Sequence, residues 1–173
     1  MNKRLSKGFT LVELMITVII LSVIVGIAYP SYQKYTTQTR RADAQIELTT
    51  TANRLEKYFS VCSSYPLAGA AGLMQPWPGN GGASQCPPDD NTQGLGLPDV
   101  NSPDGHYTIV LSTAQDALGN ACVGGNGTCF TVTATPTAGG LQAGNGALRI
   151  DYAGRRLWDR NNDASYCCSW SDK

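Results

Sequence analysis

Residues 9–29 read FTLVELMITVIILSVIVGIAY, and this stretch decides how the chain is organised. Its 21 residues contain one charged side chain, Glu13. About 20 apolar residues are enough to cross a bilayer as a helix. A buried core helix is the first alternative, but few helices of small soluble domains are apolar on every side. A secretory signal peptide is the second, but its apolar part is shorter and ends in a small-residue cleavage site, which Ala28-Tyr29-Pro30 does not match. We therefore expect residues 9–29 to form a membrane-spanning helix.

The composition bounds the class of protein. A chain of 173 residues is long enough for one domain and an appendage. The 13 basic and 13 acidic side chains balance, which argues against bulk nucleic acid or an anionic membrane surface as the main partner. The only histidine is His106, and we find no nucleophile–base pair and no phosphate-binding loop. We therefore expect neither an enzyme nor a cofactor.

The cysteines indicate which side of the membrane the body occupies. Basic residues flank the apolar segment on both sides, so the charges alone do not orient it. All six cysteines follow the segment, and an even set in a small body outside the cytoplasm is typical of disulfides. We expect a cytoplasmic N-terminus in the inner membrane, and residues 30–173 outside the cytoplasm.

Glu13 is unusual because a carboxylate inside a membrane segment is unfavourable. The cost is about 2.5–3.5 kcal/mol for a charge at the bilayer centre and less near the end of a helix. One interpretation is a functional site with a charged partner. The other is an interfacial carboxylate at the start of the helix, where the helix dipole favours acids.

The sequence around Glu13 resembles a known signal. Lys7 to Leu14, KGFTLVEL, is similar to the class III signal of type IV prepilins, which has a basic leader, a glycine, a phenylalanine and a glutamate four residues later. The resemblance to PilE-type minor pilins is good over residues 7–59, patchy over 130–170 and absent over about 61–104. It is carried by AYPSY (28–32), RRADA (40–44), RLEKYF (54–59), FTVTATP (130–136) and CSW (168–170).

The resemblance implies a processing and assembly mechanism. A prepilin peptidase would cut between Gly8 and Phe9, remove residues 1–8 as a leader and methylate the new amine of Phe9. That cation needs an anion in an apolar environment, and Glu13 of a neighbouring subunit would supply it. Because unpaired buried charges are costly, the pair would fix the axial register of the subunits. The implied partners are other pilin subunits, the peptidase, an inner-membrane assembly platform and, before assembly, membrane lipid.

The predicted function is therefore that of a minor pilin, a structural subunit of a type IV pilus at the cell surface, with roles in pilus biogenesis, motility and adhesion. A type II secretion pseudopilin or a major pilin would use the same helix. A DNA-binding competence pilin and an uncleaved single-pass membrane enzyme are alternatives from other classes.

DNA is not favoured as a partner, because the chain without its first eight residues has 10 basic and 13 acidic side chains, a net charge of −3. The basic clusters are interpreted as solvated or subunit-facing: Lys34, Arg40 and Arg41, and Arg155, Arg156 and Arg160.

The rest of the sequence predicts an α+β type IV pilin fold, in which one long helix packs on a C-terminal antiparallel sheet. An apolar stripe at helical spacing extends the helix over residues 30–61 and faces the sheet. Pro30 inside this helix is expected to kink or loosen it. The stripe consists of Ala44, Leu48, Ala52, Leu55, Phe59 and Cys62.

Loops and strands follow this helix. Residues 62–105 are rich in Pro, Gly, Ser and Asn and are predicted as a loop region, in which Trp77 is a packed or surface aromatic rather than a ligand site. The sheet is predicted within residues 106–173: β-branched residues alternate in its first two strands, and Ala153-Gly154 is a hairpin signal between the next two. The predicted strands are His106–Thr113, Cys129–Thr135, Ala147–Tyr152, Arg155–Asp159 and an edge strand Tyr166–Trp170.

Six cysteines allow about 15 pairings. Cys122–Cys129 is favoured, because the two enclose a short loop between predicted strands. Cys62 with Cys86, or either of them with Cys168, comes next. Cys167 and Cys168 are adjacent, so a bond between them would be strained, and we expect each to have a separate partner or one to stay free. The resembled family often has a Cys-Gly before the last hairpin, where this chain has Gln142 to Gly146 without cysteine, so its pairing cannot be transferred.

Acidic and amide side chains give a weak calcium candidate. Asp159, Asn161 and Asp163 have the spacing that opens a calcium-binding EF-hand loop. Ala164 stands where that loop needs glycine and Trp170 where it needs glutamate, so it is not an EF-hand. Some pseudopilins, which the chain also resembles, bind calcium near the C-terminus, which keeps the candidate open beside a plain polar turn. Asp99, Asn101 and Asp104 lie beside Pro and Gly and are predicted as turns.

Overall fold

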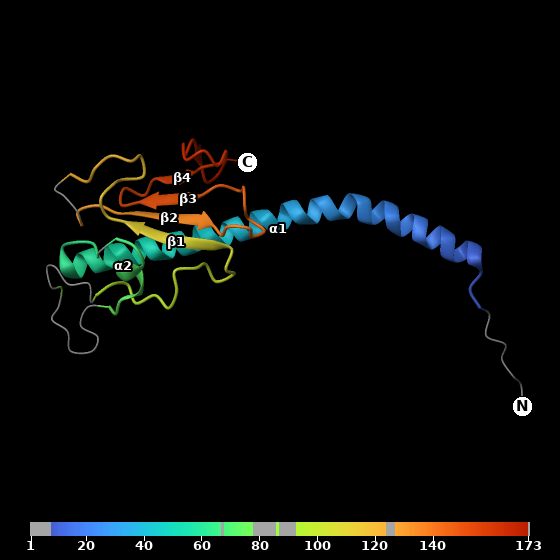
Figure 1. Ribbon diagram of the computed structural model, residues 1–173, viewed down its shortest axis with the longest axis horizontal. Helices are drawn as coiled ribbons and strands as arrows, with labels where there is room; N and C mark the ends of the chain where they lie inside the picture. Colours follow the sequence, from blue (N-terminus) through green and yellow to red (C-terminus); the bar gives the residue numbers. More distant parts are fainter. Residues whose placement is uncertain (1–7, 67, 78–85, 87–92, 124–126, 173) are drawn as a thin grey trace, which may run out of the picture. The chain divides into compact units, whose positions relative to one another are not determined.

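The computed structural model describes residues 8–66, 68–77, 86, 93–123 and 127–172. The chain divides into two compact units, Met1–Gln38 and Thr39–Lys173. One helix, α1 (Leu11–Cys62), runs from the first unit into the second (Figure 1). The prediction of a helix that continues past the membrane segment to residue 61 is confirmed.

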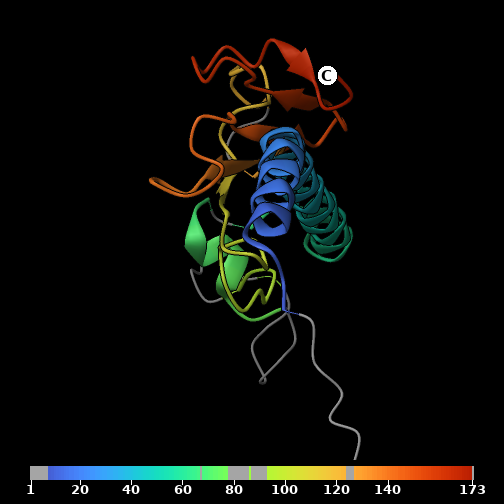
Figure 2. The same ribbon diagram turned by 90° about the vertical axis from the view of Figure 1, so that its right-hand side faces the viewer.

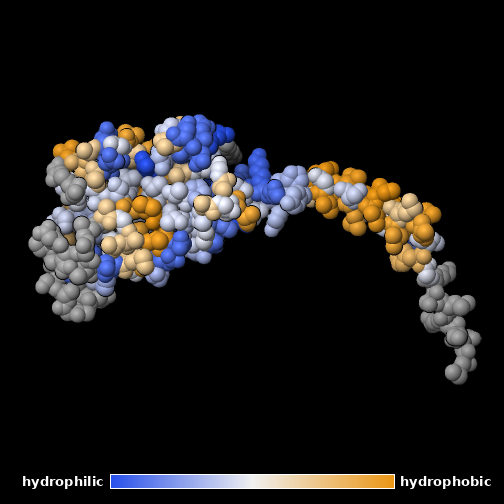
Figure 3. All heavy atoms as spheres, viewed as in Figure 1, coloured by the Kyte–Doolittle hydropathy of each residue, from blue (hydrophilic) through white to orange (hydrophobic). Residues whose placement is uncertain are grey.

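The first unit contains the apolar part of α1. This is one helix long and apolar enough to cross a membrane by length and composition, and the apolar window is not buried at all within the chain. Figure 3 shows the corresponding surface as a run of hydrophobic residues. The side chains from Leu11 to Ile27 are therefore available to lipid or to other helices.

Pro30 lies inside α1 without ending it. The helix is assigned continuously from Leu11 to Cys62, although proline cannot donate the backbone hydrogen bond to the preceding turn. A break at Pro30 is thus not observed, and the predicted kink or loosening stays a prediction.

The second unit combines the C-terminal half of α1 with a five-stranded antiparallel sheet in the order β1-β2-β3-β4-β5. Each strand pairs with its neighbour in sequence, and the predicted α+β pilin-like fold is confirmed. The strands begin and end within about two residues of the predicted bounds. They are β1 (Tyr107–Ser112), β2 (Thr131–Pro136), β3 (Leu148–Asp151), β4 (Arg156–Trp158) and β5 (Cys168–Ser169).

One face of the sheet packs on α1, and Figures 1 and 2 show the strands lying beside the C-terminal half of the helix. Alternate residues of each strand point to this side, for example Tyr107, Ile109 and Leu111 of β1. The predicted stripe is right at four of its positions, where the side chains are buried. It is wrong at Phe59, which is 36% exposed, and Tyr58 is buried instead, because the contact line follows Leu48, Thr51, Leu55 and Tyr58.

A short helix, α2 (Ala70–Met74), lies in the region predicted as loop. The segment 94–97 packs directly against it, with Leu95 N–H donating to the carbonyl of Gly72 at 3.0 Å and Leu97 N–H to that of Leu73 at 2.9 Å. A Cβ on Gly94 would lie 2.6 Å from the carbonyl oxygen of Gly72, so only glycine fits there. Five residues are too few for a helical period to stand out in sequence, which is why α2 was not predicted.

Thr51 is the weak point of the helix–sheet interface. It is fully buried, and its hydroxyl is the buried side-chain polar atom without a hydrogen-bond partner in the described part of the chain. An unsatisfied buried hydroxyl destabilises the folded state by about 1–3 kcal/mol. We predict that Thr51→Val, which replaces the hydroxyl by a methyl group, raises the free energy of unfolding by about 1 kcal/mol.

Chemical denaturation of the full chain in detergent, followed by circular dichroism, measures this change. Thr49→Val is the matched control, because the Thr49 hydroxyl donates to the carbonyl of Gln45 at 2.8 Å and its loss brings no such gain. Equal effects of the two substitutions would contradict the assignment of Thr51 as unsatisfied.

Candidate functional site

The N-terminus of α1 places the three residues that the sequence assigns to processing and assembly. Phe9 precedes the helix with its side chain 81% exposed, and Glu13 lies in the first turn. Thr10 caps the helix, because its hydroxyl oxygen accepts the backbone N–H of Glu13 at 3.3 Å. The same hydroxyl faces the Glu13 carboxylate at 3.5 Å. Thr10 and Glu13 therefore form the Thr-x-x-Glu pattern of a capping box.

Sequence reasoning missed Thr10, although the spacing of the pattern was visible. The cap satisfies one of the free N–H groups of the first turn, and the helix dipole favours a carboxylate there. Among the described residues no cation lies within ion-pair distance of Glu13. The roles of Gly8, Phe9 and Glu13 in processing and assembly stay predictions.

Three disulfides are present in the second unit. Cys122 is bonded to Cys129, the pair that the sequence favours, and Cys62 is bonded to Cys86. Cys62–Cys86 connects the end of α1 to the region after α2.

Cys167 is bonded to Cys168, so the expectation of separate partners is wrong in this structure. With the other four cysteines joined in two pairs, each of these residues is the only partner left for the other within the chain. The bond lies where the chain enters β5.

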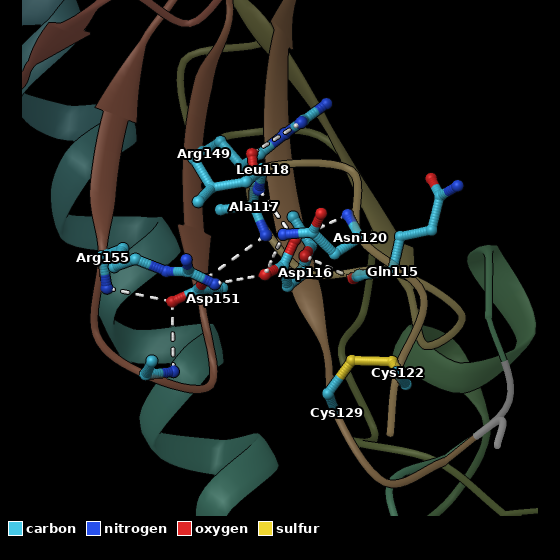
Figure 4. Close-up of polar contacts among 12 residues, drawn as sticks. Gln115, Asp116, Ala117, Leu118, Asn120, Cys122, Cys129, Arg149, Asp151 and Arg155 are labelled. Carbon is cyan, nitrogen blue, oxygen red and sulfur yellow. Dashed lines mark hydrogen bonds and ion pairs between the residues drawn. A yellow bond between two sulfur atoms is a disulfide. The ribbon is translucent and has the colours of Figure 1, made fainter. Parts of the chain in front are cut away.

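Residues 113–122, which we call the β1–β2 loop, form a tight turn that is organised by one carboxylate. Asp116 accepts the backbone N–H of Leu118 at 2.9 Å and of Asn120 at 2.8 Å, and its second oxygen accepts the Asn120 side chain at 3.1 Å. That second oxygen also pairs with Arg155 Nη2 at 2.6 Å. Figure 4 shows Asp116 between the turn and the arginine.

Hydrogen bonds and ion pairs hold the loop against the face of β2 and β3 that points away from α1. Arg155 bridges Asp116 to Asp151, whose carboxylate is fully buried and lies 2.7 Å from the guanidinium. Asp151 also accepts the N–H of Ala117 at 3.3 Å, and Arg149 donates to the carbonyl of Ala117 at 3.1 Å (Figure 4). This charged network was not predicted, because Asp116 and Arg155 are 39 residues apart in sequence and form no local motif.

Two tryptophans and three arginines gather on the helix-facing side of β4 and β5, and we call this group the Arg–Trp cluster. Arg41 of α1 lies over the Trp158 ring at 4.1 Å, with Arg160 at 5.7 Å from the same ring. Arg156 lies over Trp170 at 5.4 Å. Within the described residues, none of these arginines has a carboxylate at ion-pair distance, since the ion pairs found there all involve Arg155.

The structure thus brings together Arg41 with Arg156 and Arg160, which come from two sequence clusters. It places Arg155 apart from them, in the network with Asp116 and Asp151. The sequence interpretation that grouped Arg155 with Arg156 and Arg160 is wrong, because Arg155 precedes β4 and its guanidinium pairs with Asp116 and Asp151.

The other candidates have local structural roles. Trp77 packs edge-on against Tyr58, with ring centroids 5.9 Å apart, and Lys57 lies over it. The Asp159 carboxylate accepts the N–H groups of Asp163 and Ala164 at 3.0 and 2.9 Å, and Asp163 accepts that of Ser165. Asp99 accepts the backbone N–H of Val100 and Asn101, as a turn residue does. No group of three or more metal-binding side chains occurs among the described residues.

A buried polar group lies in the segment from Gln142 to Gly146, which has no cysteine. Gln142 is 1% exposed, and its carbonyl accepts from the Tyr107 hydroxyl at 3.2 Å and from the Asn145 amide at 2.8 Å. The Asn145 carbonyl in turn accepts from the Trp158 ring nitrogen at 2.8 Å. Burial raises the pKa of Tyr107, so its hydroxyl stays a donor. Hydrogen bonds therefore connect the segment before β3 to β1 and β4.

The apolar, capped N-terminal helix and the antiparallel sheet define a type IV pilin. Comparison with protein families agrees: residues 3–29 match the prokaryotic N-terminal methylation motif. Residues 30–146, more than half of the chain, match the family described as "Type IV minor pilin ComP, DNA uptake sequence receptor". The chain belongs to this ComP minor pilin family.

Similar proteins are also pilins. The chain is 32% identical over 72 residues to "Type IV major pilin protein PilE1" of Neisseria gonorrhoeae, 42% of this chain and 34% of that protein. It is 34% identical over 71 residues to "Fimbrial protein EcpC" of Eikenella corrodens, 41% of this chain and 46% of that protein. It is 50% identical over 48 residues to a "Fimbrial protein" of Pseudomonas aeruginosa, 27% of this chain and 31% of that protein. The chain thus matches less than half the length of each relative.

The charged network predicts how stability depends on pH. The hydrogen bond from Arg155 holds the pKa of Asp116 well below its usual range. Because the folded pKa is lowered, the stabilisation is fully present above the ordinary carboxyl pKa of about 3.9 and is lost as the pH falls towards the folded value. We predict that the melting temperature falls on acidification below about pH 4, and that Arg155→Gln lowers it at neutral pH and weakens this acid dependence.

Thermal unfolding of the full chain across a pH series measures both effects. Arg54→Gln removes the same charge from an exposed position of α1 and serves as the control. An acid dependence that is the same for Arg155→Gln and for the unsubstituted chain would show that the network does not act as described.

Proposed function

We propose that this chain is a minor subunit of a type IV pilus. It resides in the inner membrane before assembly and joins the filament by packing α1 against the helices of other subunits. The observation that carries the proposal is the apolar segment of α1, fully exposed within the chain, with one carboxylate at its start. Membership of the ComP minor pilin family favours a minor pilin over a secretion pseudopilin. The fimbrial names of its relatives agree with a place in a filament.

The apolar segment requires a nonaqueous environment. Side chains such as Leu14, Ile20 and Ile24 are each more than half exposed. Exposing apolar surface to water costs roughly 25 cal/mol for each Å². A bilayer removes this cost before assembly, and the α1 helices of neighbouring subunits remove it in a filament. Moving between the two environments therefore leaves the apolar segment covered throughout.

The charge of Glu13 makes the contact between two subunits in the filament specific. Cleavage between Gly8 and Phe9 by a prepilin peptidase creates an amine on Phe9, and methylation leaves it cationic. The Phe9 amine of one subunit and the Glu13 carboxylate of another then compensate each other in an apolar surrounding, where an unpaired charge is unfavourable. Thr10 orients the carboxylate at the end of the helix until the partner arrives. An inner-membrane assembly platform would bring the two subunits together.

We predict that Glu13→Ala leaves the protein in the membrane but lowers its incorporation into pili at least tenfold, because an uncompensated amine would remain in the filament core. Immunoblotting of sheared pili against the membrane fraction measures the ratio. Glu47→Ala removes an acid from the same helix in the second unit and is the matched control.

Mass spectrometry of the mature N-terminus accompanies this experiment and separates processing from assembly. We expect methylated Phe9 in both variants. An intact Met1 in cells with an active peptidase would refute the pilin mechanism, and normal incorporation of the Glu13 variant would refute the charge pair alone.

DNA capture is the second candidate function, and the family match to a DNA uptake sequence receptor favours it despite the net charge of −3. The Arg–Trp cluster has suitable chemistry. Its three guanidinium groups have no carboxylate partner among the described residues, and Arg156 and Arg160 are exposed. Guanidinium groups bind phosphates in a bidentate manner, and their affinity for DNA depends steeply on salt. The local charge of this cluster matters more than the net charge of the chain.

We predict that the full chain in detergent binds a short fluorescent DNA duplex, and that Arg156→Gln with Arg160→Gln weakens binding about tenfold and lowers the salt slope by about two. Fluorescence anisotropy between about 50 and 200 mM salt measures both quantities. Arg54→Gln with Lys57→Gln removes the same charge from α1 and is the control. Absence of binding at low salt would remove DNA capture and leave the pilus proposal intact.

A further inference from the structure

The bond between Cys167 and Cys168 differs in kind from the other two disulfides. Its Cα atoms are 3.8 Å apart, as the shared peptide bond dictates, whereas those of Cys62–Cys86 and Cys122–Cys129 are 5.2 and 5.6 Å apart. The two Cα atoms of a disulfide are usually about 4.4–6.8 Å apart, and disulfides outside this range are reduced more readily. Adjacent residues also close almost no loop, so the bond constrains the unfolded chain little. Its effect on the protein is therefore local.

Access to a thiol also distinguishes this bond. Cys167 is exposed, whereas Cys62, Cys86, Cys122 and Cys168 are partly buried and Cys129 is only 3% exposed. Thiol–disulfide exchange proceeds by attack of a thiolate on one sulfur, so exposure favours reaction. Attack at Cys167 would leave the thiolate of Cys168 as the departing group.

The backbone before this bond is held in an uncommon conformation. Asn162, Ala164 and Tyr166 have φ angles of 56°, 63° and 46°, although none is a glycine. Such residues are uncommon and need support from their surroundings. Asp159 holds the first part of the segment through Asp163 and Ala164, and Arg149 lies 3.7 Å from the centroid of the Tyr166 ring. The disulfide ring is the last constraint before β5.

Strand β5 has few contacts of its own. It pairs with β4 only through Trp158 with Cys168 and Leu157 with Ser169. Beyond it, the Trp170 ring nitrogen donates to the Leu157 carbonyl at 2.9 Å, and Asp172 accepts the Ser169 N–H at 2.6 Å. Two residue pairs give little stability to a strand at the edge of a sheet, so β5 depends on the direction in which the chain enters it.

We propose that Cys167–Cys168 is a thiol-exchange site, and that its reduction releases β5 and Trp170 from the edge of the sheet. The co-reactant is a dithiol, such as an extracytoplasmic thiol-disulfide oxidoreductase with a Cys-x-x-Cys site. One thiolate of the dithiol attacks Cys167 and expels the Cys168 thiolate, which takes up a proton. The second thiolate then attacks the mixed disulfide, so the dithiol leaves oxidised to a disulfide and the protein keeps two thiols.

The test titrates the full chain in detergent with dithiothreitol under native conditions. At each step free thiols are alkylated and mapped by mass spectrometry, and amide hydrogen exchange is measured on the same samples. We expect Cys167 and Cys168 to be alkylated at a reductant concentration about tenfold lower than the other four cysteines. We expect the peptide containing β5 to exchange about tenfold faster at that point, while peptides of β2 and β3 keep their protection.

Two results would overturn the proposal. One is reduction of Cys62–Cys86 or Cys122–Cys129 before or together with Cys167–Cys168. The other is unchanged protection of β5 after Cys167 and Cys168 have been alkylated. Neither readout depends on filament assembly or on DNA, so a failure here is distinct from a failure of the proposed function.

Variants give an independent check. Cys167→Ser with Cys168→Ser should show fast exchange at β5 without reductant and no further response to it. Cys122→Ser with Cys129→Ser is the matched control and should keep β5 protected until Cys167–Cys168 is reduced. Protection of β5 in the first variant would contradict the proposal, and if that variant does not fold, the titration of the unsubstituted chain decides.

Discussion

Burial of one stripe of α1 against the sheet is the interaction on which the second unit depends. Leu48 and Leu55 of the helix are fully buried, as are Tyr107 of β1 and Val132 of β2, and all four belong to one core. Burying a large apolar side chain stabilises the folded state by about 1.5–3 kcal/mol, so this core dominates the stability of the unit. The strands other than β5 are short too, and the helix gives them a common surface on which to align.

The N-terminal part of α1, unlike its C-terminal half, needs an apolar environment outside the chain. This part is apolar on all sides and has nothing to pack against within the chain. Such a surface is unfavourable in water and is stable where lipid or other apolar helices cover it. The pilin family meets both requirements with one continuous helix, and α1 carries the carboxylate of Glu13 in its first turn.

On the face of the sheet that α1 does not cover, ion pairs and hydrogen bonds hold a loop in place instead of apolar contacts. The β1–β2 loop lies over β2 and β3 and is fastened by Arg155, Asp116 and the buried Asp151. A buried carboxylate is tolerable here because four hydrogen bonds surround it, three from backbone N–H groups and one from the guanidinium. A network of this kind holds the loop in one conformation.

The sequence by itself determined the elements that depend on local pattern. The apolar run and the KGFTLVEL signal predicted α1 and the pilin family. β-branched alternation predicted β1 and β2, and the hairpin signal at Ala153-Gly154 predicted β3 and β4, each to within about two residues, because these signals lie in neighbouring side chains. The favoured Cys122–Cys129 pair also agrees with the structure, since its loop is short.

The tertiary structure alone decided what depends on distant residues. It separated Arg155 from Arg156, chose Tyr58 over Phe59 for the core, and left Cys167 and Cys168 to each other once the other cysteines were paired. For Arg155 and Tyr58 the deciding contacts join segments that are far apart along the chain, and local periodicity contains no information about which of them meet.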